Sequence, residues 1–347
     1  MSPTKLNVGI AGYGIVGQRR RHYIDQHLQL RTIAVCDQRF TSPGLLPDGI
    51  KSCTTYQELI EQPLDILFVC LPNYLAADAT IAGLQRDMHV FCEKPPGRNV
   101  EDVERVIAIE RTKPNLLLKY GFNHRYHNSV REALKRIKSG ELGEIINMRG
   151  VYGKSKIIPF SGGWRAERKY AGGGILLDQG IHLVDLMQLF CGEFVEAKSF
   201  ISNSFWKHDV EDNAYAIMRD AQGRIAMLHS SATQWQHRFS LDIALTKGFI
   251  TLRGILSGSK SYGEEELVVG KWDESNTGST REECTKYLED DSWRLEINEF
   301  ADAILKRGEI MNGKSSEALQ TMKLVYRIYH ADSEWRTAYK IDNPDHP

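Results

Sequence analysis

Apolar residues in the first third of the chain form short runs, and the stretches between these runs repeat their apolar positions at helical spacing. The runs predict strands over 6–12, 31–37, 64–72, 89–95 and 116–122. The intervening stretches predict helices over about 15–28, 54–62 and 76–85 and after residue 99. Strands that alternate with helices, two of them unbroken runs of Val, Ile, Leu and Phe, are typical of a parallel sheet covered on both faces. Residues 1–122 are therefore expected to form a doubly wound α/β domain.

The pattern changes after Phe122. Helical spacing returns over about 126–139, 172–187, 293–306 and 315–335. Strands are expected over 145–153, 196–202, 213–220, 224–235, 239–245, 249–254 and 265–270. Because turn signals such as Asp220–Gly223 and Lys247–Gly248 separate several of these strands, an antiparallel sheet is favoured. Residues 123–347 are therefore expected to form an α+β domain, whose helix at about 315–335 could pack back on the first domain.

Composition narrows the class of protein. The 347 residues include 44 basic and 45 acidic ones, and this balance favours neither a nucleic-acid nor a membrane partner. No apolar run approaches the roughly 18 residues that span a bilayer, and the first residues lack the layout of a secretory signal. The six cysteines show neither CxxC nor Cys/His spacing, which disfavours a disulfide framework and a zinc site. We therefore expect a cytoplasmic protein without a metal.

A glycine-rich loop follows the first predicted strand. Gly12, Gly14 and Gly17 have GxGxxG spacing between a strand and a helix, which is the context in which this motif binds a dinucleotide. The first glycine permits a tight turn, the second lets the backbone approach a pyrophosphate, and the third lets helix and strand pack closely. The N–H groups at the start of the helix then face the phosphates. Cofactor contacts are expected along the whole loop: Gly12, Tyr13, Gly14, Ile15, Val16 and Gly17.

Asp37 ends the second predicted strand, twenty residues after the last glycine of the loop. A carboxylate here accepts hydrogen bonds from the adenosine ribose and repels a 2′-phosphate, so NAD is favoured as the cofactor. Arg39 could instead pair with that phosphate, which keeps NADP as the alternative. Gln38, between them, is expected to line the same site.

A basic run, Arg19 to His22, follows the glycine loop. Basic runs on helices are more often solvated faces than binding sites. We interpret this run as solvated, with a contact between Arg19 or Arg20 and the diphosphate as the alternative.

Glu93 and Lys94 stand between a predicted strand and two prolines, in the sequence FCEKPPG. Ligands of a doubly wound sheet bind beyond the carboxyl ends of its strands. Because the two prolines stiffen the loop, Lys94 is well placed to meet a substrate oxygen. The alternative is an ordinary surface pair of opposite charges.

The stretch GGGILLDQGIHLVDLM, residues 172–187, places polar side chains in an apolar helix. Residues four apart on a helix share a face, so Asp178 and His182 are expected to point the same way. Asp185 points elsewhere and is expected to be structural or supporting. One explanation is an Asp–His hydrogen bond that serves only structure. The other is an acid–base pair that faces a cleft, where the three glycines allow close approach of a cofactor or substrate.

Taken together and in this order, the GxGxxG loop, EKP at 93–95 and GGGILLDQGIHLVD at 172–185 resemble the Gfo/Idh/MocA (glucose–fructose oxidoreductase/inositol dehydrogenase) family. The resemblance spans nearly the whole chain. It implies a Rossmann domain followed by a C-terminal α/β domain with a large, mostly antiparallel, open-faced sheet, and an active site between them. It also implies a homodimer or homotetramer built through that sheet.

The resemblance assigns roles to single residues. Lys94 matches the lysine that contacts the reacting hydroxyl, and Asp178 and His182 match the acid and the histidine of the catalytic helix. Leu71 and Ala76 stand where the family more often has threonine and histidine, which weakens the expected cofactor contacts of that loop. The other matches are Leu71, Pro72, Asn73 and Glu93 beside the cofactor, Trp164 and Arg165 near nicotinamide and substrate, and Asn123, Arg125 and Tyr126 in the substrate pocket.

These residues suit the oxidation of a secondary alcohol, in which the cofactor takes a hydride and the protein moves a proton. His182 is the natural base because imidazole titrates near neutral pH. Asp178 can orient that ring, and Lys94 can stabilise the developing alkoxide. Whether Lys94 or His182 takes the proton first is left open.

Basic residues with interleaved aromatic ones lie between 153 and 170; they could hold phosphates while the aromatics cover a sugar or base, or they could form a solvated loop. The sequences FNHRYH, WRA, DQGIHLVDL and VEDNAY resemble the family branch found in nucleotide-sugar and polysaccharide synthesis. We therefore expect a sugar or nucleotide-sugar substrate, with ring carbon 3 preferred. The alternatives are a free polyol or aldose dehydrogenase, an NAD-dependent lyase or glycosidase that oxidises its substrate transiently, and a non-catalytic NAD-dependent sensor.

Overall fold

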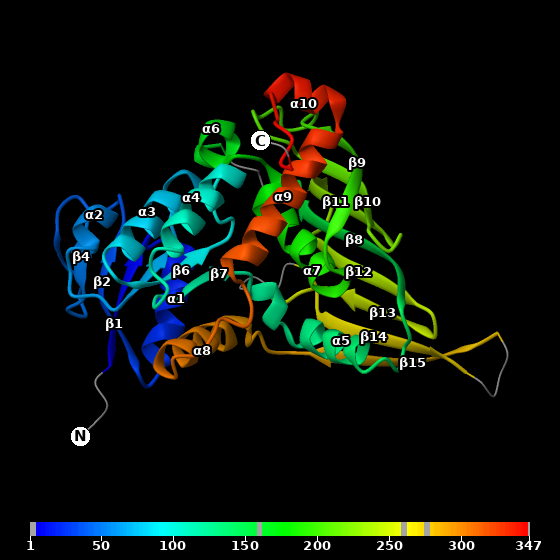
Figure 1. Ribbon diagram of the computed structural model, residues 1–347, viewed down its shortest axis with the longest axis horizontal. Coiled ribbons are helices and arrows are strands. Elements are labelled where there is room, and N and C mark those ends of the chain that lie inside the picture. Colours follow the sequence, from blue (N-terminus) through cyan, green and yellow to red (C-terminus); the bar gives the residue numbers. More distant parts are fainter. Residues whose placement is uncertain (1–4, 158–161, 258–261, 274–277, 346–347) are drawn as a thin grey trace. The chain divides into compact units, whose positions relative to one another are not determined.

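The structure is a computed structural model that describes residues 5–157, 162–257, 262–273 and 278–345. The chain divides into two compact units. Unit 1 comprises Met1–Phe122, Lys169–Gly172 and Trp293–Leu319, and unit 2 comprises Asn123–Arg168, Gly173–Ser292 and Gln320–Pro347. Within the described residues, the strands form a seven-stranded sheet in unit 1 and an eight-stranded sheet in unit 2 (Figure 1).

The sheet of unit 1 has the strand order β3-β4-β2-β1-β5-β6-β7. Its pairs are parallel except for β3 with β4. The strand order runs outward in opposite directions from β1 and β5, as in a doubly wound sheet. The strands are β1 (Leu6–Ala11), β2 (Leu30–Cys36), β3 (Gly44–Leu45), β4 (Lys51–Cys53), β5 (Ile66–Val69), β6 (His89–Glu93) and β7 (Leu118–Gly121). The helices are α1 (Ile15–Gln26), α2 (Tyr56–Leu59), α3 (Asn73–Gln85), α4 (Val100–Glu110) and α8 (Ser292–Leu305).

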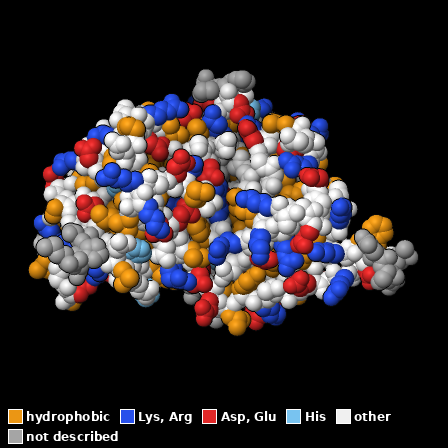
Figure 2. All heavy atoms as spheres, turned by 60° about the horizontal axis from the view of Figure 1, so that its bottom comes forward, with side chains coloured by type: hydrophobic (Ala, Val, Ile, Leu, Met, Phe, Trp, Pro, Cys, Tyr) orange, Lys and Arg blue, Asp and Glu red, His pale blue; other side chains and the backbone are white. Residues whose placement is uncertain are grey.

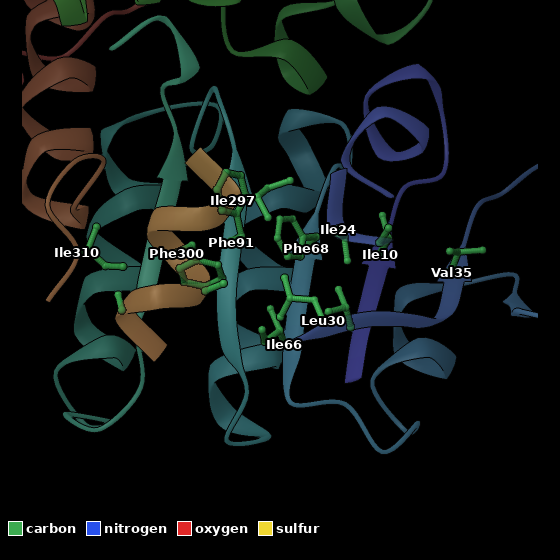
Figure 3. Packing of buried hydrophobic residues seen from close by; sticks show 13 residues of the cluster. Ile10, Ile24, Leu30, Val35, Ile66, Phe68, Phe91, Ile297, Phe300 and Ile310 are labelled. Carbon is green, nitrogen blue, oxygen red and sulfur yellow. The ribbon is translucent and has the colours of Figure 1, made fainter. Parts of the chain in front are cut away.

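The core of unit 1 includes a helix from the far end of the sequence (Figure 3). Phe68 of β5 stacks on Phe91 of β6 with ring centroids 4.8 Å apart, and Phe300 of α8 meets both rings edge-on at 6.1 and 5.7 Å. Because Ile297 and Ala301 are buried in the same cluster, α8 belongs to the first sheet. This corrects the expectation that all of 123–347 forms the second domain.

The sheet of unit 2 has the order β15-β14-β13-β12-β8-β11-β10-β9 and is antiparallel except between β8 and β11. This matches the expected mostly antiparallel sheet. Its strands are β8 (Ile145–Ser155), β9 (Phe194–Ser202), β10 (Asn213–Asp220), β11 (Ile225–Gln234), β12 (Arg238–Leu245), β13 (Gly248–Arg253), β14 (Glu265–Trp272) and β15 (Thr280–Tyr287). Its helices include α5 (Asn128–Lys138), α7 (Ile181–Cys191) and α10 (Ser333–Tyr339), while α9 (Ser315–Ala331) begins in unit 1 and continues in unit 2.

Helix α7 packs directly on the middle of this sheet. A Cβ atom on Gly150 of β8 would lie 2.8 Å from the side chains of both Leu183 and Met187. A side chain at this strand position would therefore require the ends of Leu183 and Met187 to shift. The close packing fixes the position of α7, which carries His182, relative to β8.

The surface agrees with the balanced composition. Figure 2 shows basic and acidic side chains interspersed over the viewed face. Of the helices in the described ranges, none is both long enough and apolar enough to cross a membrane.

Candidate active site

The glycine-rich loop has the geometry of a dinucleotide cradle. Gly12 adopts φ +91°, and a Cβ there would lie 2.3 Å from the carbonyl oxygen of Cys70. A Cβ on Gly17 would lie 2.0 Å from the carbonyl oxygen of Gly12, whereas one on Gly14 would meet open space. Helix α1 begins after Gly14 without a side-chain cap, so its first N–H groups are available to a phosphate. This loop therefore fits a dinucleotide.

Asp37 is held at the end of β2. Its carboxylate accepts hydrogen bonds from the backbone N–H of Tyr13 at 3.0 Å and from Nε of Arg39 at 2.8 Å. Burial opposes ionisation of Asp37, but the bonds from Arg39 and Tyr13 outweigh it and lower the pKa of the carboxyl. The charged carboxylate beside the loop is suited to a ribose hydroxyl and unsuited to a 2′-phosphate. Arg39 pairs with Asp37 and is exposed.

The loop before α3 is less clearly aimed at a cofactor. Leu71 and Pro72 are half-buried, and Asn73 is the first residue of α3. The amide group of Asn73 donates a hydrogen bond to the carbonyl oxygen of Ala171 at 2.7 Å. This bond connects α3 to the segment 169–172. The sequence predicted only a contact of Asn73 with the cofactor and not this bond.

The EKP segment lies over a buried arginine. Glu93 accepts a hydrogen bond from Nε of Arg20 at 2.6 Å, and the guanidinium of Arg20 reaches Glu296 of α8 at 2.7 Å. Arg20 is fully buried between the rings of Phe91 and Trp293, with its Cζ 4.4 and 4.2 Å from their centroids. Burial raises the pKa of Glu296 to about 7, although Arg20 and Lys119 oppose the rise.

This network corrects the interpretation of Arg20. Arg20 is neither solvated nor a diphosphate ligand, because its charge is matched by two carboxylates inside unit 1. Glu93, expected to contact the cofactor, has its carboxylate engaged by Arg20. Lys94, the next residue, is half-buried, and its peptide bond to Pro95 is cis.

In unit 2, His182 is buried near the start of α7. Its ring stacks on the ring of His124, with centroids 3.7 Å apart and planes at 11°. Nε2 of His124 lies 3.2 Å from the hydroxyl of Tyr152 on β8. Burial raises the pKa of Tyr152 well above its ordinary value, and Tyr262 and Asp178 add to the rise. The neutral phenol of Tyr152 and the imidazole of His124 thus form part of the surroundings of the expected base.

Asp178 lies on a π-helical turn, Leu176–Gly180, that precedes α7. The regular helix expected over 172–187 is therefore divided. The side chain of Asp178 is 30% exposed, and its carboxylate lies 3.9 Å from Nε of Arg165. A wide turn of this kind is frequent at functional sites. It places Asp178 at a more exposed position than the buried His182.

The glycine run packs closely against other segments of the protein. A Cβ on Gly172 would lie 2.0 Å from the carbonyl oxygen of Arg98 within unit 1. In unit 2, a Cβ on Gly173 would lie 2.2 Å from the hydroxyl of Tyr329, and one on Gly174 would lie 2.1 Å from the carbonyl oxygen of Glu211. The three glycines therefore allow close packing of the protein on itself, and the expected close approach of a cofactor or substrate stays a prediction.

Arg125 and Asp185 form a buried ion pair. Nε and Nη2 of Arg125 donate to the two carboxylate oxygens of Asp185 at 2.8 and 2.6 Å, and both side chains are at most 4% exposed. The pair fastens the segment after β7 to α7, which confirms a structural role for Asp185. The guanidinium of Arg125 is thus engaged by the protein, and its expected substrate contact stays a prediction.

Asn123 and Tyr126, expected in the same pocket, are buried beside this pair. The amide group of Asn123 donates to Oγ of Ser292 at 3.2 Å, and its oxygen lies 3.2 Å from Nδ1 of His124. Asn123 thereby orients the imidazole that stacks on His182. Its place in the structure is next to the expected base.

The basic cluster between 153 and 170 is dispersed. Lys154 is half-buried, and burial lowers its pKa while Asp178 partly opposes the change. The ammonium group of Lys156 lies 3.5 Å from the ring centroid of Trp235, which is 70% exposed. Arg165 lies over Trp164 at 4.3 Å. Arg168 instead lies over the rings of Tyr329, Trp335 and Tyr339.

Sequence reasoning missed two polar residues of unit 2 as site candidates: His124 and Glu211. Lys154 was predicted only as part of the basic cluster between 153 and 170, although strand periodicity also places it on the same face of β8 as Gly150 and Tyr152, which face α7. Neither His124 nor Glu211 has a local signal, since each meets its partner only through tertiary packing. The described residues contain no group of His, Cys, Asp and Glu suited to a metal ion.

A dinucleotide cradle on a doubly wound sheet, followed in the chain by an α+β unit with buried, stacked histidines, is typical of an NAD-binding oxidoreductase of two parts. Comparison with protein families gives the same class. Residues 6–122 match the oxidoreductase family model with the NAD-binding Rossmann fold, and residues 130–251 match the GFO/IDH/MocA C-terminal domain. The chain therefore belongs to the Gfo/Idh/MocA oxidoreductase family, and its first domain is an NAD-binding Rossmann domain.

Several relatives carry sugar names. The chain is 30% identical to 1,5-anhydro-D-fructose reductase of Ensifer adhaerens over 212 residues, which cover 60% of this chain and 62% of that protein. It is 27% identical to D-glucoside 3-dehydrogenase of Escherichia coli over 255 residues, 67% and 71% of the two chains. The structure of levoglucosan dehydrogenase with NADH and L-sorbose superposes with a TM-score of 0.82 at 19% identity, over 95% and 97% of the chains. This last similarity concerns the fold.

Proposed function

We propose that the protein transfers a hydride between NAD and a secondary hydroxyl of a sugar or nucleotide sugar. The observation that carries the proposal is the group of polar residues around α7 in a member of this oxidoreductase family: His182 stacks on His124, and the charge of Asp178 acts on the half-buried Lys154. Lys94 of the Rossmann domain is proposed to act on the same substrate hydroxyl. In support, Lys94 follows β6 at the carboxyl end of the parallel sheet, where ligands of this fold bind.

Each proposed residue has one task. The bound cofactor accepts or returns the hydride. His182 takes the hydroxyl proton, because a neutral imidazole is a base near neutral pH. Asp178 is proposed to orient the imidazole of His182, and its partly exposed carboxylate also lies close to Arg165. Lys94 stabilises the negative charge that develops on the substrate oxygen.

The substrate class follows from the relatives' names and from unit 2. The names 1,5-anhydro-D-fructose reductase and D-glucoside 3-dehydrogenase support a pyranose-like sugar, and the second supports oxidation at ring carbon 3. Lys156 over the exposed ring of Trp235 supports an anionic, flat extension such as a nucleotide diphosphate. A free sugar without such an extension is the second candidate.

The outer face of the second sheet supports a homodimer or homotetramer. Tyr215, Ile217 and Met227 on β10 and β11 are 50, 54 and 42% exposed and share that face. Adjacent exposed apolar side chains of this kind are typical of an interface. Ile217→Lys is expected to shift the protein to monomers in light scattering, whereas Ile157→Lys, at an exposed site outside this sheet, should leave its mass unchanged.

A cytoplasmic location is proposed as well. Cys36 and Cys53 are paired residues of adjacent strands, yet both are free thiols. A reducing compartment suits such an arrangement.

The test is a screen of sugars and nucleotide sugars for stoichiometric reduction of NAD. The reduction is monitored by the absorbance of the nicotinamide. Lys94→Ala and His182→Asn should slow turnover by about 10²–10⁴-fold. Lys113→Ala, which removes a lysine paired with Asp87 on the surface of the same unit, should turn over normally. Entry of solvent deuterium into the sugar without net reduction would instead indicate a lyase or glycosidase, and binding without turnover of any sugar would indicate a sensor.

A further inference from the structure

We propose that Glu211 is a positioning residue, whose carboxylate holds the turn that carries Asp178 and thereby sets the geometry of the acid–base pair. The inference deepens the proposed function and rests on it. Glu211 lies in the loop before β10 and is fully buried. Its carboxylate accepts hydrogen bonds from backbone N–H groups, so its action is through the backbone.

Glu211 satisfies three consecutive N–H groups at the start of this turn. One carboxylate oxygen accepts from the N–H of Gly174 at 2.7 Å, and the other accepts from the N–H of Leu176 at 2.9 Å. The backbone carbonyl of Glu211 accepts from the N–H of Ile175 at 3.1 Å. The first N–H groups of a helix have no partners within the helix. One residue from a distant part of the chain thus fixes the backbone immediately before Asp178.

Tyr329 of α9 completes the arrangement. Its hydroxyl donates to the carboxylate of Glu211 at 2.6 Å. Burial raises the pKa of Glu211, whereas the Tyr329 hydrogen bond and the nearby charge of Arg168 oppose the rise. The ionised form is favoured by a helix start, which attracts negative charge.

The glycine run makes this contact possible. Both Gly173 and Gly174 lie so close to Tyr329 and Glu211 that a side chain would meet them within 2.2 Å. The next residues are equally constrained, because the carbonyl oxygen of Ile175 accepts a hydrogen bond from Ser230 on β11 at 3.1 Å. The segment is therefore fixed on two sides before it reaches Asp178.

A displacement of this segment reaches the acid–base pair directly. Leu176 is two residues before Asp178, and the N–H of Asp178 itself donates to the carbonyl oxygen of Gly174 at 2.8 Å. Misplacing a reacting group by about 1 Å can slow a reaction by about 10²-fold. Loss of the Glu211 carboxylate should therefore reduce the chemical step while leaving cofactor affinity intact, because the glycine-rich loop belongs to the other unit.

The test compares Glu211→Gln with a matched variant, Glu265→Gln. Glu265 is also buried in unit 2 and also accepts a backbone N–H at a helix start, that of Ser129 in the first turn of α5, at 2.9 Å. Both substitutions remove the charge of a buried carboxylate that accepts backbone hydrogen bonds. They differ in that α5 carries none of the proposed acid–base residues. A merely structural role would give the two variants the same phenotype.

The expected results separate kcat from binding. Glu211→Gln should lower kcat by about 10–100-fold, change the pH profile of kcat, and leave KM for the sugar and Kd for NADH within about twofold of wild type. Glu265→Gln should retain kcat and its pH profile. Tyr329→Phe, which keeps the carboxylate and removes one of its donors, should lower kcat less, in the same direction.

Hydrogen exchange gives a measurement that does not depend on turnover. The amides of residues 174–182 should lose protection in Glu211→Gln and keep it in Glu265→Gln. Equal kcat losses in the two glutamate variants, or wild-type kcat and protection in Glu211→Gln, would overturn the proposal. If Glu211→Gln does not fold, Tyr329→Phe decides by the same criteria. If none of the tested sugars supports NAD reduction by the wild type, the proposed function fails. The exchange data then still decide whether Glu211 orders the turn.

Discussion

The buried carboxyl of Glu296 makes the stability of the Rossmann unit depend on pH. Its folded-state pKa is raised from 4.5 to about 7, because burial outweighs the attraction of Arg20 and Lys119. For a carboxyl with a raised pKa, the folded state holds its proton over a range in which the unfolded chain has released it. Stability from this group is therefore present below pH 4.5 and is lost as pH rises to about 7.

The size of the effect follows from the two pKa values. Each unit of pKa difference corresponds to about 1.4 kcal/mol. Because the carboxyl titrates at about 7 in place of 4.5, its contribution to the free energy of unfolding falls by about 3 kcal/mol over that range. Glu296→Gln has no proton to lose. Its free energy of unfolding, relative to wild type, should therefore rise by about 3 kcal/mol between pH 4.5 and 7.5. Groups such as His27 and His89 titrate in both proteins and cancel in the difference.

The measurement must report on the Rossmann unit alone. Native-state hydrogen exchange of the amides of β1 and β5, converted to opening free energies at several pH values, does so. Glu101→Gln, an exposed position on α4 in the same unit, is the control and should follow wild type throughout. A difference between Glu296→Gln and wild type that stays constant across this pH range would refute the reasoning, because Glu296 would then be ionised throughout.

Three further substitutions test single contacts. Asp37→Ala removes the repulsion of a 2′-phosphate and releases Arg39, so the ratio of kcat/KM with NADP to that with NAD should rise by about tenfold or more; an unchanged ratio would contradict the assignment. Asp185→Asn leaves the buried charge of Arg125 partly unmatched and should cost about 3–5 kcal/mol of stability in urea unfolding, a prediction that fails if the loss is below about 1 kcal/mol. Gly174→Ala places a Cβ 2.1 Å from a backbone oxygen, so its amide protection in the π-helical turn should fall; undiminished protection would show that the turn adapts.

The parallel sheet was predictable because its strands are buried on both faces. Strands β1, β5 and β6 are runs of apolar residues in the sequence, and they lie where those runs predict them. Strand β15 was missed for the opposite reason. It is an edge strand whose residues Thr280–Tyr287 are mostly exposed and charged, so it lacks the apolar alternation that identifies a strand.

Helix α8 shows a different limit of the sequence pattern. Apolar positions at helical spacing predicted the helix itself, over 293–306 against an observed Ser292–Leu305. The pattern does not say which sheet an amphipathic helix covers. Phe300 packs on strands some two hundred residues earlier in the chain, and such a pairing is decided by tertiary packing. The same limit applies to Arg20, whose two carboxylate partners come from β6 and α8.

The same limit separates the residues of the candidate site that the sequence identifies from those it does not. Residues identified by local motifs, such as Gly12 and Lys94, lie on loops in which a few neighbouring positions are enough to indicate the function. The buried polar residues are different, because each is stable only with a partner from elsewhere in the chain. Glu211 and Glu265 show what this means for function. Both accept backbone hydrogen bonds at helix starts. Asp178, a proposed acid–base residue, follows the contact of Glu211, whereas no such residue follows the contact of Glu265. The proposed chemistry therefore gives only Glu211 a role beyond stability.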